Sequence, residues 1–178
     1  MVPSSKISQV WVETAIYTLI GLTLIAVVLS AALPQIEKIK DRETVKQTIV
    51  AINQLNQKIA EAREAPSSTR LYDIVISKGK LEIDGEKETI TYVLENTKLE
   101  FSEVGEKIKE GDIITETQKY GSRFNILLSI NLTKNTNLTF NNLDVLKTLQ
   151  PGPSPYRLVI YNNGTIDPQG RYVVDISI

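Results

Sequence analysis

The side chains that most often carry out catalysis or hold metal ions are scarce in this sequence. Cysteine and histidine are both absent, which excludes a disulfide framework, thiolate and imidazole metal ligands, and the Ser/His/Asp and Cys/His triads. Carboxylates, lysines, tyrosines and hydroxyl groups remain. Any active site would have to be built from these groups alone.

The densest group of carboxylates could in principle form an acid–base pair or a calcium site. These carboxylates belong to Asp73, Glu82, Asp84, Glu86 and Glu88, and they are interleaved with Lys78, Lys80 and Lys87. Their spacing does not fit a calcium-binding loop. We interpret them as the solvated face of a hairpin, and we expect no metal site, no cofactor, no small-molecule substrate and no enzymatic activity.

Three asparagines stand in the pattern that accepts N-linked glycans. Asn131, Asn137 and Asn163 are each followed by threonine two residues later. The pattern has meaning only if this part of the chain lies outside the cell. We therefore treat the three asparagines as candidate glycosylation sites of an exported domain.

A long apolar segment lies near the N-terminus. From Thr14 to Leu33 the chain carries no charged residue, and a helix over this range, at about 1.5 Å per residue, matches the thickness of a hydrocarbon core. A buried core helix and a signal peptide cleaved near Ser30 are the alternatives. The length of the run, and the helical pattern that continues beyond it, favour a retained transmembrane helix over residues 9–33.

One acidic residue lies at the edge of this apolar segment. A carboxylate close to hydrocarbon is costly and is usually paired or functional. Glu13 is that residue, and Trp11 lies just before it. Glu13 either has a specific partner or marks the water boundary beside an interfacial tryptophan.

The N-terminal sequence MVPSSKIS-QVWVETAIYTLIGL resembles an archaeal type IV prepilin with a class III signal peptide. The shared features are a short polar leader, a basic residue, a small residue, and then glutamine and glutamate ahead of the apolar helix. The resemblance implies that a membrane-bound prepilin peptidase removes residues 1–8 by cutting between Ser8 and Gln9. Cutting after Lys6 is the alternative. It also implies that Glu13 meets the free amine of a neighbouring subunit during assembly with other copies or other pilins.

A second helical pattern follows the apolar segment. Pro34 is expected to kink the helix, because proline removes a backbone donor and clashes with the preceding turn. Over residues 34–65, apolar side chains recur every three or four positions, which indicates an amphipathic helix that continues the anchor. This apolar stripe packs either on the chain's own globular domain or on the same stripe of other copies.

Residues 66–178 have the pattern of short strands separated by turns, which predicts an antiparallel β-sheet or β-sandwich. Strands are expected at 71–77 and 80–84 as a hairpin, and at 89–95, 98–103, 112–118, 123–132, 137–140, 156–161, 164–167 and 171–178. Residues 142–149 fit either a strand pair or a short helix. The predicted fold is therefore α+β, with a long kinked N-terminal helix followed by a β-rich surface domain.

The charge balance gives no reason to expect a nucleic-acid partner, because the net charge is −1 with 20 basic and 21 acidic residues. The resemblance favours a subunit of a type IV pilus-like surface filament in the cell membrane, with one membrane span and an extracellular C-terminal domain. A monomeric tethered adhesin is the alternative. A cytoplasmic domain comes third, favoured by Lys38, Lys40, Arg42 and Lys46 after the anchor.

Overall fold

The computed structural model describes the backbone of residues 4–178 and the side chains from Val10 onward. The start of the expected leader, residues 1–3, lies outside the described residues. The chain divides into two compact units, one ending at Lys40 and the other covering Asp41–Ile178. Each unit is described by itself below.

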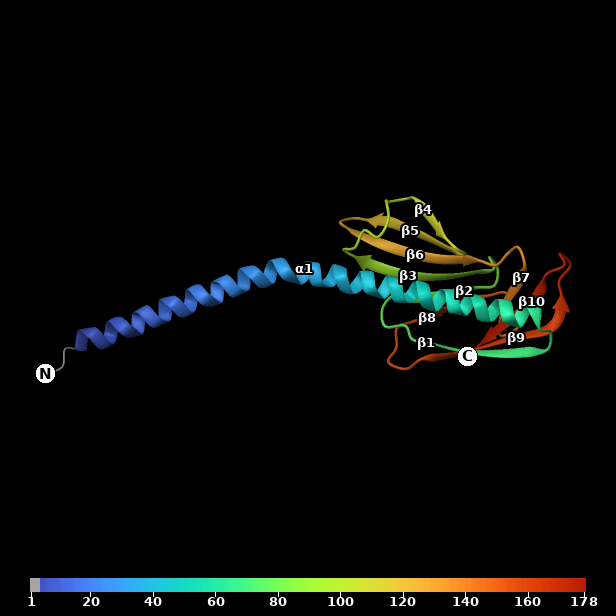
Figure 1. Cartoon of the computed structure of the whole chain (residues 1–178), viewed down its shortest axis with the longest axis horizontal. Helices are drawn as coiled ribbons and strands as arrows, with labels where there is room; N and C mark the ends of the chain where they lie inside the picture. Colours follow the sequence, from blue (N-terminus) through green and yellow to red (C-terminus); the bar gives the residue numbers. More distant parts are fainter. Residues whose placement is uncertain (1–3) are drawn as a thin grey trace. The chain divides into compact units, whose positions relative to one another are not determined.

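A single long helix, α1 (Ser4–Glu64), opens the chain (Figure 1). Strong helix formers such as leucine, alanine, glutamate, lysine and glutamine fill much of its length, and they favour helix because they lose little side-chain freedom in it. The long N-terminal helix predicted from the sequence is confirmed. Helical structure continues on both sides of Pro34, and the kink predicted there stays a prediction.

The second unit contains the last part of α1 and all the strands. Apolar side chains on one face of this part of α1 are 0 or 1% exposed, and they are Val45, Ile52, Leu55, Ile59 and Ala62. They belong to the same hydrophobic cluster as the strand residues. In this stretch, the apolar stripe therefore packs on the chain's own domain.

The first sheet has four strands in the order β1-β9-β10-β7. Its strands are β1 (Ser68–Ile74), β9 (Tyr156–Ile166), β10 (Tyr172–Ser177) and β7 (Thr136–Phe140). Two of its three pairings are antiparallel, and β10 pairs with β7 in parallel. The sheet is therefore mixed.

The second sheet has six strands in the order β4-β5-β6-β3-β2-β8, and every pairing is antiparallel. Its strands are β4 (Lys107–Glu110), β5 (Ile113–Tyr120), β6 (Arg123–Asn131), β3 (Thr89–Thr97), β2 (Lys80–Asp84) and β8 (Leu146–Leu149). Side chains of β6 alternate, with Ile126, Leu128 and Ile130 buried between half-buried or exposed neighbours. This alternation is typical of a sheet with one face in the core.

Both sheets and the C-terminal part of α1 contribute to one hydrophobic core. The fully buried side chains come from each layer, for example Leu55 of α1, Ile90 of β3 and Ile160 of β9. The α+β class and the β-rich domain predicted from the sequence are confirmed, with the parallel pairing of β7 and β10 as an addition to the expected antiparallel pattern.

The hairpin predicted for residues 71–77 and 80–84 is wrong. β1 pairs with β9 in the first sheet, whereas β2 pairs with β3 and β8 in the second. The chain between them crosses from one sheet to the other, and both Ile74 and Ile76 are buried on the way. Gly79 has a φ of 75°, so it supplies a left-handed residue to a crossing segment and not to a hairpin turn.

Three other segments also differ from the expected strands. Residues 98–103 form no strand, because buried Leu99 is held by a local bond from its N–H to the Thr97 hydroxyl at 2.9 Å. Within 142–149, only β8 is regular. β9 runs without a break through Asn162 and Asn163, where two separate strands were expected.

Candidate functional site

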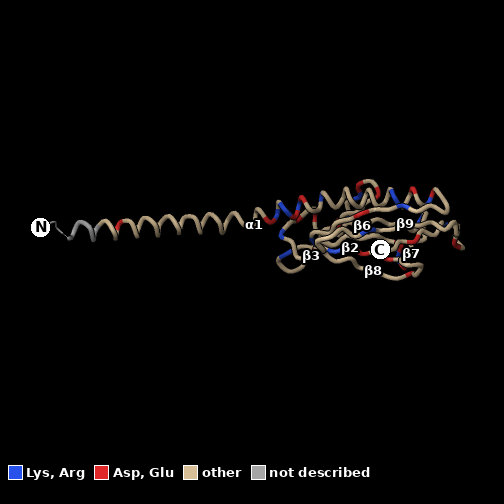
Figure 2. Tube along the Cα trace, turned by 90° about the horizontal axis from the view of Figure 1, so that it is seen from below, with Lys and Arg blue, Asp and Glu red and all other residues tan. Residues whose placement is uncertain are grey.

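The apolar surface of α1 is the most distinctive feature of the first unit. Side chains along Val10–Leu33 are exposed in large fractions, reaching 74% for Trp11 and 70% for Tyr17. In Figure 2, the stretch of α1 that follows the grey residues is tan apart from one acidic position, while both signs of charge are spread over the second unit. The helix is long and apolar enough to span a membrane, and none of its most apolar stretch is buried.

The serine and threonine hydroxyl groups within this apolar stretch are satisfied by the helix itself. Each donates a hydrogen bond of 2.7 or 2.8 Å to a backbone carbonyl three or four residues earlier. The donors are Thr14, Thr18, Thr23 and Ser30, and the acceptors are the carbonyls of Val10, Thr14, Leu19 and Val27. An unpaired hydroxyl in hydrocarbon is costly, so these internal bonds make the helix compatible with a lipid environment.

Glu13 is the one charged residue between Val10 and Leu33. Its side chain is exposed among apolar neighbours, and it lies one helical turn before Tyr17 on the same face. Among the residues with described side chains, none forms an ion pair with Glu13. The carboxylate is thus presented on an otherwise apolar surface and can be reached by a cation from outside the chain.

The bond between Ser8 and Gln9 lies within the first turns of α1, and the side chains of both residues fall outside the described part. Cleavage at this bond stays a prediction. Pro34 lies at the other end of the apolar stretch, inside the helix. Because proline has no N–H, the carbonyl of Ser30 has no backbone donor one turn later.

A buried polar cluster lies where the second unit begins. The Asp41 side chain is only 2% exposed and accepts hydrogen bonds from Lys78 Nζ and Thr97 Oγ1, both at 2.5 Å. The cluster joins α1 to the loop before β2 and to the end of β3. Sequence reasoning missed it, although Asp41 lies one turn before Val45 on the apolar face of the helix. An acid within an apolar stripe was the available signal.

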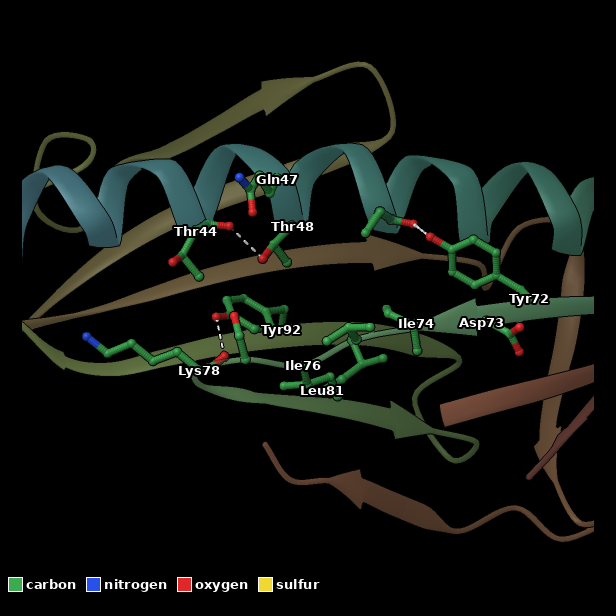
Figure 3. A pocket seen from close by; sticks show the side chains of 13 residues that line it. Thr44, Gln47, Thr48, Tyr72, Asp73, Ile74, Ile76, Lys78, Leu81 and Tyr92 are labelled. Atoms are coloured by element: carbon green, nitrogen blue, oxygen red, sulfur yellow. Dashed lines mark hydrogen bonds between the residues drawn. The ribbon is translucent and has the colours of Figure 1, made fainter. Parts of the chain in front are cut away.

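A pocket of about 230 Å³ lies between α1 and the segment that joins β1 to β2 (Figure 3). Two tyrosine hydroxyl groups at this pocket bond to backbone carbonyls of the chain. Tyr72 donates its hydroxyl to the Ala51 carbonyl at 2.9 Å, and Tyr92 donates to the Lys78 carbonyl at 2.6 Å. Burial raises the pKa of Tyr92 to about 12.

The carboxylates singled out in the sequence do not converge on one site. Four of these carboxylates form ion pairs, each with a different cation. The ion pairs are Asp73 with Arg157, Glu82 with Lys80, Asp84 with Lys87, and Glu88 with Arg171. Asp84 and Glu88 are 7% and 9% exposed, so the interpretation as a solvated face is wrong for these two. Within the described residues, no group of three or more acidic side chains could hold a metal ion.

The ion pairs also set the titration of these acids. The Arg157 guanidinium, which donates to both carboxylate oxygens at 2.9 and 3.1 Å, lowers the pKa of Asp73. Burial alone would raise the pKa of Asp84, but hydrogen bonds from the backbone and side chain of Lys87 bring it below its usual value. Both groups are therefore held in the charged form, which suits a structural role and not acid catalysis.

The three candidate glycosylation sites differ in exposure. Asn131 at the end of β6 and Asn163 within β9 are exposed, and so are their threonines, Thr133 and Thr165. Asn137 is half-buried in β7, and its threonine, Thr139, is buried. The structure does not bring the three asparagines together into one site.

Comparisons with protein-family models, with curated proteins and with solved structures found no match to this chain. Among the features described above, the apolar surface of Val10–Leu33 needs a covering, because exposed apolar area of this extent is unfavourable in water.

Proposed function

We propose that this chain is a membrane-anchored surface protein and a subunit of a type IV pilus-like filament. The observation that carries the proposal is the exposed apolar surface of α1 over Val10–Leu33, which is long and apolar enough to cross a bilayer. Such a surface must be covered by lipid or by similar surfaces of other copies. In the filament, the helices would exchange lipid for one another while the β-rich domain faces outward.

Glu13 would give this assembly its register. A carboxylate that enters a low-dielectric helix bundle needs a positive partner, because an unpaired buried charge is strongly destabilising. After cleavage before Gln9, a neighbouring copy would supply its new α-amino group as that partner. The resemblance of the N-terminus to archaeal prepilins supports this pairing.

The proposed orientation has the second unit outside the cell. The resemblance of the N-terminus to archaeal prepilins supports this orientation. Lys38, Lys40 and Arg42 follow the apolar stretch and would favour the opposite orientation in a simple charge count. Long domains are translocated largely regardless of flanking charge, so a dedicated export route can override this bias.

The first test is the intact mass and N-terminal sequence of the protein recovered from its native cell envelope. A chain that begins at Gln9 supports prepilin-type processing. A chain that retains residues 1–8 and is monomeric in detergent contradicts the filament and leaves a tethered adhesin or binding module.

The second test compares Glu13→Gln with Glu43→Gln. Glu43 is an exposed carboxylate on the same helix, and its Oε1 accepts a hydrogen bond from Gln47 Nε2 at 3.0 Å. We expect Glu13→Gln to abolish surface filaments while the protein stays in the membrane, and Glu43→Gln to leave filaments at the wild-type level. Filaments that persist in Glu13→Gln, or that are lost in both variants, would refute the role of Glu13.

A further inference from the structure

We propose that Asn131 and Asn163 carry N-linked glycans in the native protein, that Asn137 carries none, and that the two glycans cover the end of the second unit where α1 terminates. The inference rests on the outward orientation in the proposed function. It goes beyond the sequence motif, because the motif is the same at all three asparagines and the structure distinguishes them.

Asn131 is exposed, and a local hydrogen bond holds its side chain. Its side-chain oxygen Oδ1 accepts a hydrogen bond from the backbone N–H of Thr133 at 3.0 Å. This bond holds the side chain in a local turn and leaves the amide nitrogen Nδ2 as its unused donor. No group within the described residues accepts a hydrogen bond from this nitrogen. Asn131, Thr133 and the next two residues are exposed, so there is room for a bulky substituent.

Asn163 repeats the same local geometry in another part of the fold. Its Oδ1 accepts a hydrogen bond from the N–H of Thr165 at 2.8 Å. Residues 163–166 are all exposed. Gly164 has a φ of 81°, which glycine tolerates, and the pairing of β9 with β10 is irregular between Asn162 and Ile166. The Asn163 amide nitrogen again has no acceptor among the described residues.

The side chain of Asn137 is half-buried in the folded domain. Its Nδ2 donates to Asp167 Oδ2 at 3.4 Å, and its Oδ1 is buried without a partner. The hydroxyl of Thr139 is also engaged, because it donates to Asp175 Oδ1 at 2.7 Å in the buried pairing of β7 with β10. A glycan on Asn137 would have to break the Asp167 contact and displace the groups that bury Oδ1. Folded protein should therefore lack it.

The modification needs a donor outside this chain, and a lipid-phosphate-linked glycan has the required chemistry. The asparagine Nδ2 forms a bond to the anomeric carbon of the sugar, and the bond between that carbon and the phosphate oxygen breaks. The lipid phosphate departs with the bonding electrons, and Nδ2 releases one proton. No oxidant or reductant is involved.

Both exposed sites lie close to the last turns of α1. Asn131 lines a pocket together with Asn56 and Arg63 of the helix. Next to Asn163, the buried Asn162 donates to the carbonyls of Ala62 and Arg63 at 3.0 and 3.1 Å. Glycans at both sites would shield this end of the domain. Contacts between subunits must then use other surfaces of the second unit.

Tryptic digestion separates the three sites and so gives a direct test. Cleavage after lysine and arginine places Asn131 in residues 124–134, Asn137 in residues 135–147 and Asn163 in residues 158–171. The protein should be purified from native membranes and its peptides measured by mass spectrometry. We expect glycan mass on the first and third peptides and none on the second. Thr133→Ala and Thr165→Ala should each remove one glycan while keeping the asparagine.

Protease treatment of intact cells separates failure of this inference from failure of the proposed function. If external protease degrades the second unit and the three peptides are unmodified, the glycan inference is refuted and the outward orientation stands. Glycan on the Asn137 peptide would also refute it. If the domain is unmodified and protected from external protease, the outward orientation fails and the glycan inference fails with it.

Discussion

Replacing Asp41 with alanine tests whether the buried ion pair at the start of the second unit holds the helix on the β-sheets. The substitution removes the acceptor of Lys78 and of the Thr97 hydroxyl, which both lie 2.5 Å from the carboxylate. Thr97 is fully buried, whereas the Lys78 side chain is 43% exposed. The hydroxyl is therefore left without an acceptor, and the ammonium can still reach water.

These two effects set the expected magnitude. A buried group left without a hydrogen-bond partner costs about 1–3 kcal/mol. Removing one member of a fully buried ion pair costs about 3–5 kcal/mol, and this figure must be reduced here because Lys78 remains half exposed. We expect Asp41→Ala to lower the free energy of unfolding of the second unit by about 2–4 kcal/mol.

The measurement is urea unfolding of the full chain in detergent. Trp11, the single tryptophan, lies in the apolar stretch, so tyrosine near-ultraviolet circular dichroism is the better signal for the second unit. Asp73→Ala is the matched control, because the Asp73–Arg157 pair is exposed and such pairs contribute little. If Asp41→Ala shifts the urea midpoint no more than Asp73→Ala does, the cluster does not hold the helix in place.

The neighbourhood of Lys78 gives two further predictions. The folded state holds the Tyr92 proton more tightly, with a pKa of about 12, than the unfolded chain does at about 10. The stability that this raised pKa contributes is present below pH 10 and is lost as the pH rises towards 12. A phenolate absorbance titration should thus show a late-ionising tyrosine that is missing in Tyr92→Phe. In Gly79→Ala, the new Cβ would meet the Val93 carbonyl at 2.6 Å in a left-handed backbone, and we expect a loss of about 2–4 kcal/mol in urea unfolding. Gly121→Ala, which is left-handed with open space around it, should lose only about 1–2 kcal/mol.

Local patterns in the sequence were sufficient to predict the elements whose burial follows a simple period. In α1, the apolar positions Val45, Ile52 and Ile59 recur at helical spacing, and all three are buried. In β6, alternation of apolar and polar residues predicted the strand, and Ile126, Leu128 and Ile130 of this pattern are buried. Such elements are predictable because one face of the element is buried in the core. Whether a residue must be apolar then follows from its own position along the helix or strand.

Strand pairing was not predictable in the same way, because it depends on residues far apart in the chain. Lys78-Gly79 has the composition of a hairpin turn, yet β1 finds its partner more than eighty residues later in β9. The parallel pairing of β7 with β10 likewise has no local signal. Asp41 shows a third limit, since its partners Lys78 and Thr97 are set by tertiary packing.

The boundary between the two units makes the Glu13 experiment specific. Every residue of the buried hydrophobic cluster lies at Val45 or later, so the core of the second unit uses no side chain from Val10–Leu33. A change at Glu13 should consequently leave the urea midpoint of the second unit at its wild-type value. Loss of filaments with an unchanged midpoint would place the effect of Glu13 in the association of helices. Loss of filaments together with a lowered midpoint would mean that the anchor and the domain fold as one unit, and the assembly role of Glu13 would no longer follow from the experiment.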